Sequence, residues 1–154
     1  MSFSLDLKAF ADKTNAKVNA AVREIVRGVD ESLVEKSPVG NADLWAHAES
    51  KPKGYVGGRF RANWQYGENE IPSGELYEAN NGVGYPGASD TIERAMSKVS
   101  LEAGGKHHFL ANNLPYAQRL EDGWSSKQAP AGMVAITVIE FDPIVKAAVL
   151  KVNL

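Results

Sequence analysis

The residues whose types could support catalysis are few and poorly clustered in this sequence. His107 and His108 are adjacent, and adjacent side chains of a strand point to opposite faces, so the two are poorly placed to share one metal ion. The third histidine, His47, lies in a segment predicted to be a loop. A solvated strand end is therefore favoured over a metal site or a general base.

Glu121 and Asp122 form an acid pair, the second candidate for chemistry. Neighbouring carboxylates on a turn are usually solvated, and no further acid lies at the defined distance that glycosidase chemistry requires. The sequence has no cysteine, which excludes disulfides and thiolate metal sites. We therefore expect no catalytic residue, cofactor or metal, and a hydrolase or metal enzyme built around the adjacent histidines is kept only as a third hypothesis.

A basic and aromatic stretch over 51–64 is the remaining candidate. Its members interleave without an acidic residue between them: Lys51, Lys53, Tyr55, Arg59, Phe60, Arg61 and Trp64. This pattern is typical of a nucleic-acid-binding face, but a net charge of -2 gives no overall attraction to a polyanion. The acidic stretch 68–78 offers another partner, by pairing between identical subunits. A small nucleic-acid-binding protein is therefore the second hypothesis.

Length and composition indicate a single domain over 1–154. The apolar content of 44% and the charged content of 23% are typical of a globular domain. Charged residues interrupt the first twenty positions, which argues against a signal peptide. No apolar run approaches the ~20 residues of a membrane-spanning helix, so no membrane partner is expected.

The clearest predicted element is an amphipathic helix over 5–36. Its apolar positions recur at spacings of three and four: Leu7, Ala11, Val18, Val22, Ile25, Val29 and Leu33. Ser37 and Pro38 end it. At ~1.5 Å per residue the helix would be ~45 Å long. It could lie across its own sheet or pack partly on a neighbouring copy.

The other elements are shorter. Alternation of Phe60, Ala62, Trp64 and Tyr66 predicts a strand over 59–66, and a second strand is expected over 108–111. Helices are expected over 90–101 and 116–120, and long loops over 41–56 and 67–89. The predicted fold class is α+β, with the long N-terminal helix packed on a small, mostly antiparallel sheet, further short helices and a C-terminal helix.

The segment 112–133, NNLPYAQRLEDGWSSKQAPAGM, is dense in turn formers and aromatic residues. Such a composition indicates a shaped surface for docking rather than turnover. Trp124 follows Gly123 in a turn and is interpreted as an interface residue, whereas Trp64 is interpreted as core.

Several motifs resemble one known family. They are SPVG at 37–40, GRFRANW at 58–64, NNLPYA at 112–117, LEDG at 120–123 and QAPAGM at 128–133. Together they resemble the tail-completion (neck) proteins of long-tailed bacteriophages, the lambda Z-like minor tail protein family. The sequence departs from the family at 41–56, an insertion between the Pro-Val element and the Arg-rich segment.

The resemblance implies a virion structural protein that is assembled in the host cytoplasm and located in the neck. It would form a ring, a homohexamer by family expectation, that completes the tail and joins it to the head. The implied partners are other copies of the chain, a head-closure or connector protein, and a tail terminator or tail tube protein, with DNA only as cargo through the lumen. The residues expected at subunit or partner interfaces are Arg59, Arg61, Asn113, Pro115, Tyr116, Leu120, Glu121, Trp124, Gln128, Pro130 and Met133.

The resemblance also bears on two local predictions. The β-branched run 133–141 favours a strand by propensity, but similar chains are helical here, so we expect a helix over 131–150 that is interrupted near Pro143. Glu121 is expected to make an orienting contact with an arginine, with Arg119, Arg59 and Arg61 as the alternatives.

Overall fold

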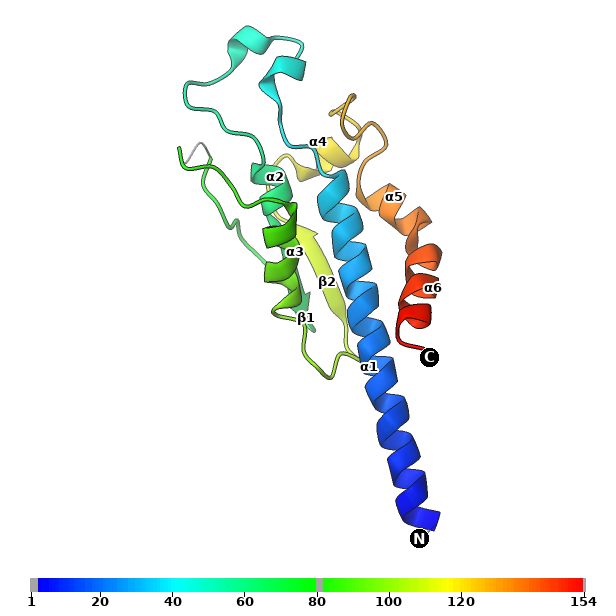
Figure 1. Ribbon diagram of the computed structural model, residues 1–154. Helices are drawn as coiled ribbons and strands as arrows, with labels where there is room; N and C mark the ends of the chain where they lie inside the picture. Colours follow the sequence, from blue (N-terminus) through cyan, green and yellow to red (C-terminus); the bar gives the residue numbers. More distant parts are fainter. Residues whose placement is uncertain (1–2, 80–81, 154) are drawn as a thin grey trace.

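Helix α1, Phe3–Lys36, is the longest element, and the others are arranged around its C-terminal half (Figure 1). The computed structural model describes residues 3–79 and 82–153. The predicted N-terminal helix is confirmed, and it ends immediately before the Ser37-Pro38 pair.

The two halves of α1 have different surroundings. Residues 6–16 are all exposed, whereas Val26, Leu33 and Val34 are buried in the core. Lys17, at the junction, donates a hydrogen bond to the Asn153 carbonyl at the other end of the chain. The N-terminal part of α1 therefore projects beyond the body of the protein (Figure 1).

The sheet has two antiparallel strands. β1, Trp64–Glu68, pairs with β2, His108–Asn112, so that Trp64 lies opposite Asn112 and Glu68 lies opposite His108. The predicted second strand is confirmed. The fold is α+β, as the sequence predicted, with α1 and the short helix α3, Ala88–Met96, packed together beside this hairpin.

The strand predicted over 59–66 is wrong in its first half. Arg59–Ala62 forms a helical turn, α2, and only the second half extends into β1. Gly58 has a φ of 106°, which few residues other than glycine adopt, and this bend turns the chain into the helix. Phe60 is buried in the helical turn, and a strand with the predicted alternation would bury it too, so alternation could not distinguish the two.

The C-terminal segment is helical, as the resemblance implied and against its β propensity. Helix α5, Val134–Ile139, is followed by α6, Phe141–Lys151, and the break at Glu140 lies shortly before Pro143. Buried hydrogen bonding favours the helix here, because Thr137 bonds both the Met133 carbonyl and the Ser32 hydroxyl of α1.

The remaining elements are short. Helix α4 is Ala117–Glu121, close to the predicted turn, and α3 ends at Met96 rather than near residue 101. The segment 37–58 contains two single 3₁₀ turns, Ala42–Leu44 and Ala48–Ser50. Between β1 and α3 the described residues form neither helix nor strand, and residues 80–81 of the predicted loop lie outside the described part.

The core joins α1, the sheet, α3 and the start of α5. Its buried apolar members include Val26, Val34, Phe60, Trp64, Tyr66, Ile92, Met96, Val99, Leu114 and Met133. Ile92, Ala95 and Met96 of α3 are buried in this core, together with Val99 just after the helix. Among the described residues, no helix is long and apolar enough to cross a bilayer.

One acid is enclosed in this core. Asp30 of α1 is fully buried, and neither carboxylate oxygen has a hydrogen-bond partner within the described chain. Burial raises the pKa of Asp30 from 3.8 to about 7, against the attraction of the nearby Arg94 guanidinium. Arg94 is itself held by the carbonyls of Ala62 and Trp64. Asp30 is therefore a poorly compensated charge at neutral pH.

Candidate functional site

An open groove of about 600 Å³ lies at the end of the molecule where α1 terminates, opposite the projecting N-terminal part (Figure 1). It is walled by the loop after α1, by α2, by the loop before α3, and by α4 with the segment that follows it. Six aromatic side chains line it: Trp45, Tyr55, Phe60, Tyr85, Tyr116 and Trp124. We refer to this feature as the aromatic groove.

Ring contacts shape the walls of the aromatic groove. Trp45 and Tyr55 meet edge to face with centroids 4.9 Å apart, which closes the 41–56 segment on itself. Phe60 and Tyr116 lie 6.2 Å apart at the floor. Burial raises the pKa of Tyr116, although the Arg59 guanidinium opposes this, so its phenol stays neutral and can donate a hydrogen bond.

Trp124 forms part of the rim and remains 71% exposed. The Arg119 guanidinium lies over its ring at 5.2 Å from the centroid, an arrangement that orients the indole without covering it. Trp64, by contrast, is buried and donates its indole N–H to the Ser37 hydroxyl at 2.7 Å. The prediction that Trp64 belongs to the core is confirmed.

The charges in the groove are of one sign. Its described lining contains Arg59 and Lys127 and no acidic side chain. Arg59 donates to the Tyr77 carbonyl and forms an ion pair with Glu75. Pairing of Arg59 with the acidic stretch between subunits was predicted from the sequence, but Glu75 of that stretch pairs with Arg59 within the same chain.

Glu121 has a different partner from the one predicted. Its carboxylate accepts hydrogen bonds from the backbone N–H groups of Met133, Val134 and Ala135 at 2.8–2.9 Å, and so caps the first turn of α5. Burial acts to raise the pKa of Glu121, but these three donors together lower it below the ordinary value. The expected contact with an arginine is replaced because unpaired N–H groups at a helix start compete strongly for an anion.

Two glycines permit this cap. A Cβ on Gly132, where φ is 76°, would lie 2.5 Å from the Glu121 carboxylate, and a Cβ on Gly123 would lie 2.5 Å from the Pro130 carbonyl. The LEDG and QAPAGM motifs are therefore brought together by close backbone approach. Their spacing reflects contacts within the chain.

The predicted interface residues divide into two groups. The groove brings together Arg59, Tyr116, Leu120, Trp124 and Gln128. The described lining does not include Arg61, Asn113, Pro115, Glu121, Pro130 and Met133. Met133 is 1% exposed and lies in the core, so it is not available to a partner.

Hydrogen bonds account for several members of both groups. The Gln128 side-chain oxygen accepts from the Val39 N–H at 2.8 Å and joins two walls of the groove. Asn113 donates to the Pro72 carbonyl at 3.0 Å. The Nε atom of Arg61 is buried and has no hydrogen-bond partner within the described part of the chain.

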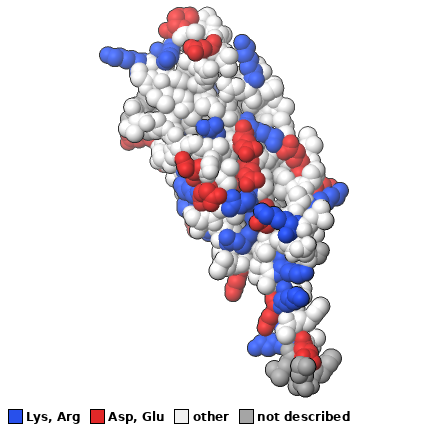
Figure 2. Space-filling model, viewed as in Figure 1, with Lys and Arg blue, Asp and Glu red and all other residues white. Residues whose placement is uncertain are grey.

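The basic stretch 51–64 does not form one continuous face. Lys51 and Lys53 are exposed on the loop, whereas Arg59 is held by Glu75. Figure 2 shows basic and acidic side chains interspersed over the visible face, without a basic stripe. This distribution does not favour nucleic-acid binding by backbone contacts.

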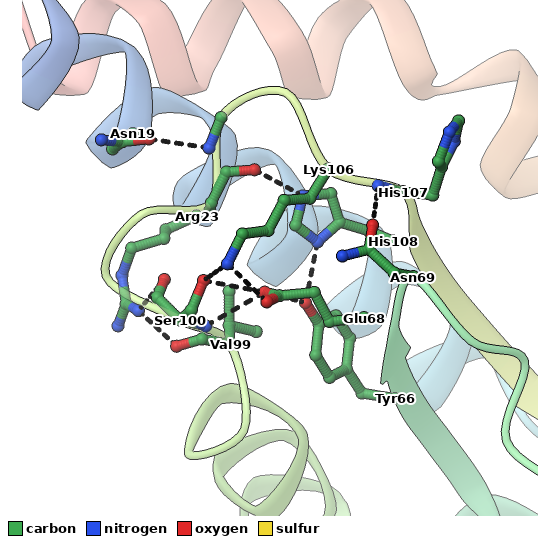
Figure 3. Close-up of polar contacts among 12 residues, drawn as sticks. Asn19, Arg23, Tyr66, Glu68, Asn69, Val99, Ser100, Lys106, His107 and His108 are labelled. Carbon is green, nitrogen blue, oxygen red and sulfur yellow. Dashed lines mark hydrogen bonds and ion pairs between the residues drawn. The ribbon is translucent and has the colours of Figure 1, made fainter.

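A second polar cluster closes the other end of the sheet (Figure 3). Glu68 accepts hydrogen bonds from Lys106 at 2.7 Å and from the Ser100 hydroxyl at 2.9 Å. The Lys106 ammonium, helped by Ser100, lowers the pKa of Glu68 to about 2. A carboxylate this acidic is a weak general base, so the cluster is suited to fastening the loop 97–107 over the sheet.

His108 belongs to this cluster and is not a solvated strand end as predicted. Its Nε2 atom donates to the Ala103 carbonyl at 2.9 Å, and Nδ1 lies 2.7 Å from the Tyr66 hydroxyl (Figure 3). Tyr66 lies on the paired strand, so the cross-strand neighbour holds the ring. His107, which precedes β2, is exposed.

Neither site resembles a metal centre. Within 3–79 and 82–153, no group of three or more His, Asp and Glu side chains could hold a metal ion. Sequence reasoning missed Tyr85 as a groove residue and Asp30 as a buried acid. Asp30 stands at helical spacing between Val26 and Leu33, and that pattern would have identified it.

Comparison with known proteins gives no relative from which to transfer a role. No family model, curated protein or solved structure matched the chain in these comparisons. The function is therefore argued from the geometry of the chain itself.

Proposed function

We propose that this chain is a structural protein of a bacteriophage neck, which forms a ring that completes the tail and joins it to the head connector. The observation that carries the proposal is the aromatic groove. It brings residues from each of the five family-like motifs, among them Val39, Phe60, Tyr116, Leu120 and Gln128, to one open and largely apolar surface, which suits docking of another protein.

The composition of the groove suggests what it receives. Exposed aromatic rings at a rim are typical anchors of protein interfaces. The described lining carries two cations, of which Arg59 is already paired with Glu75, so a segment with apolar side chains and a carboxylate placed near Lys127 would fit the groove. In a neck, such a segment would belong to the head-closure protein, the connector or the tail terminator. The ring lumen would pass DNA as cargo, without specific contacts.

Genetic replacement in the phage that encodes the chain tests the proposal. Trp124→Ala removes the exposed rim anchor and should weaken partner association by about 2 kcal/mol or more, as truncation of a hot spot does. Lysates should then contain filled heads and separate tails in electron micrographs. Leu101→Ala is the matched control, because Leu101 is also exposed and apolar but does not line the groove.

Two results would count against this role. One is normal infectious particles that contain the Trp124→Ala protein, which would remove the groove from assembly. The other is the absence of the wild-type protein from purified virions by mass spectrometry, which would remove the proposed location.

A further inference from the structure

The surface of the molecule carries two apolar areas outside the aromatic groove. The first is the projecting part of α1, where Leu7, Phe10, Ala11 and Val18 share one face by their helical spacing. Phe10 is 69% exposed and Leu7 is 57% exposed. We call this face the α1 tip.

The second area is the outer side of α5. Val134 and Val138 lie one helical turn apart and are exposed, and the exposed Ile139 and Phe141 follow them at the junction with α6. Ile139 is 78% exposed. We call these four residues the α5 patch.

Both areas are energetically incomplete in a single copy. The α1 tip leaves the apolar side chains of Leu7 and Phe10 in water, and burying them against a partner would be favourable. Helix α5 has apolar residues on every side, and helices of that kind are normally buried. Its inner side, with Thr137 and Met133, already packs against the body, so the outer side requires a cover.

We propose that the α1 tip of one copy docks on the α5 patch of a second copy. Helix α1 is already the packing partner of the α5–α6 region within the chain, where Gly28 lets Ile144 of α6 approach closely. The second copy would therefore use the same helix, further toward its N-terminus, on the opposite side of α5–α6.

Charge also favours a second copy over an anionic surface. Around the α1 tip, Asp6 and Asp12 alternate with Lys8 and Lys13, and next to the grey atoms at the end of the molecule Figure 2 shows both red and blue groups. Near the α5 patch, Asp142 and Lys146 are both exposed. Each side thus offers opposite charges to the other, and neither has the excess of cations that a membrane or a nucleic acid would attract.

Because the two areas are different, the contact is head to tail and repeats from copy to copy, and it forms a ring where the rotation between successive copies closes. This inference rests on the proposed ring and assigns its subunit contact to residues outside the predicted interface set. The aromatic groove would then remain free for a different protein.

Paired charge substitutions test the contact. Phe10→Asp inactivates the tip and Ile139→Asp inactivates the patch, while Leu101→Asp places the same charge on an equally exposed apolar residue elsewhere. Each of the first two should weaken self-association by at least about 30-fold in sedimentation experiments. Far-UV spectra and thermal midpoints should match those of the wild type, since none of the three residues is buried.

The mixture of the two defective proteins provides the sharpest result. In this mixture only the intact tip of the Ile139→Asp protein can bind the intact patch of the Phe10→Asp protein. The remaining tip and patch of that pair are both defective, so the assembly should stop at a one-to-one dimer. The absence of native cysteine allows the same contact to be trapped chemically. A mixture of Phe10→Cys and Ile139→Cys proteins should form the mixed disulfide under mild oxidation, in excess over either homodimer and over any product with Leu101→Cys.

The outcomes separate this inference from the proposed function. Two results would overturn the tip-to-patch contact and leave the neck role standing. One is that Phe10→Asp and Ile139→Asp both form rings as the wild type does. The other is that the Phe10→Cys homodimer is the main product of the oxidised mixture. A wild-type protein that stays monomeric at every concentration, and is missing from virions, would overturn both.

Discussion

Replacing the buried acid of α1 should make folding stability less sensitive to pH. The folded protein binds the Asp30 proton more tightly than the unfolded chain does, because the pKa rises from 3.8 to about 7 on folding. This carboxyl therefore has no effect on stability below its unfolded pKa. As the pH rises toward the folded pKa, it lowers the free energy of unfolding progressively.

The size of the effect follows from the shift. A change of one pKa unit corresponds to about 1.36 kcal/mol, so the full penalty at alkaline pH is about 4 kcal/mol. Between about pH 5 and pH 8 the part that develops is about 2.5 kcal/mol. Asp30→Asn removes the ionisation and keeps the shape, so the stability of the variant relative to the wild type should rise by this amount across that interval.

Urea denaturation at closely spaced pH values measures the difference directly. Other titrating groups are common to both proteins and cancel in the comparison. Asp12→Asn serves as the control, because Asp12 lies on the same helix but is exposed. If the curves of Asp30→Asn and the wild type run parallel from acid to alkaline pH, Asp30 is not the buried, poorly compensated charge described here.

Two further substitutions test the contacts behind the family-like motifs. Glu121→Ala should lower the free energy of unfolding by about 2 kcal/mol, because three N–H groups at the start of α5 lose their acceptor. The control Asp122→Ala should lower it much less. Equal losses for the two variants in chemical denaturation would argue against the cap. Gly132→Ala should be clearly more destabilising than Gly54→Ala. Both glycines have a φ near 76°, but a Cβ on Gly54 meets nothing within 4 Å. Equal thermal midpoints of the two variants would show that the close approach of Glu121 to Gly132 does not make a side chain at position 132 destabilising.

The spacing of apolar residues predicted those elements that pack mainly through apolar side chains. The helix over 5–36 was identified because a single apolar stripe determines which side faces the core. The turn at 59–62 was not, because one helical turn and a short strand can both bury Phe60. For 133–141 the residue types favour a strand, and no local rule detects the long-range hydrogen bond between Ser32 and Thr137.

Several residues of the candidate site were predicted from the sequence, but their hydrogen-bond and ion-pair partners were not. Tyr116, Leu120 and Trp124 were identified from the density of turns and aromatic residues, and they line one groove. The partners of Arg59, Gln128 and Glu121 depend on segments many residues away, so spacing along the chain could not supply them. His108 shows the same limitation, since its environment is set by the paired strand.

The three hydrogen bonds from the start of α5 to Glu121 indicate that the LEDG and QAPAGM motifs serve the fold of the chain itself. Residues that recognise their own backbone constrain the fold, and a protein with the same motifs need not share a binding partner. Selectivity would instead reside in the 41–56 segment and the Trp124 rim, which can vary without disturbing the cap. Within the proposed role, exchanging that segment between neck proteins should transfer the choice of partner while leaving the scaffold unchanged.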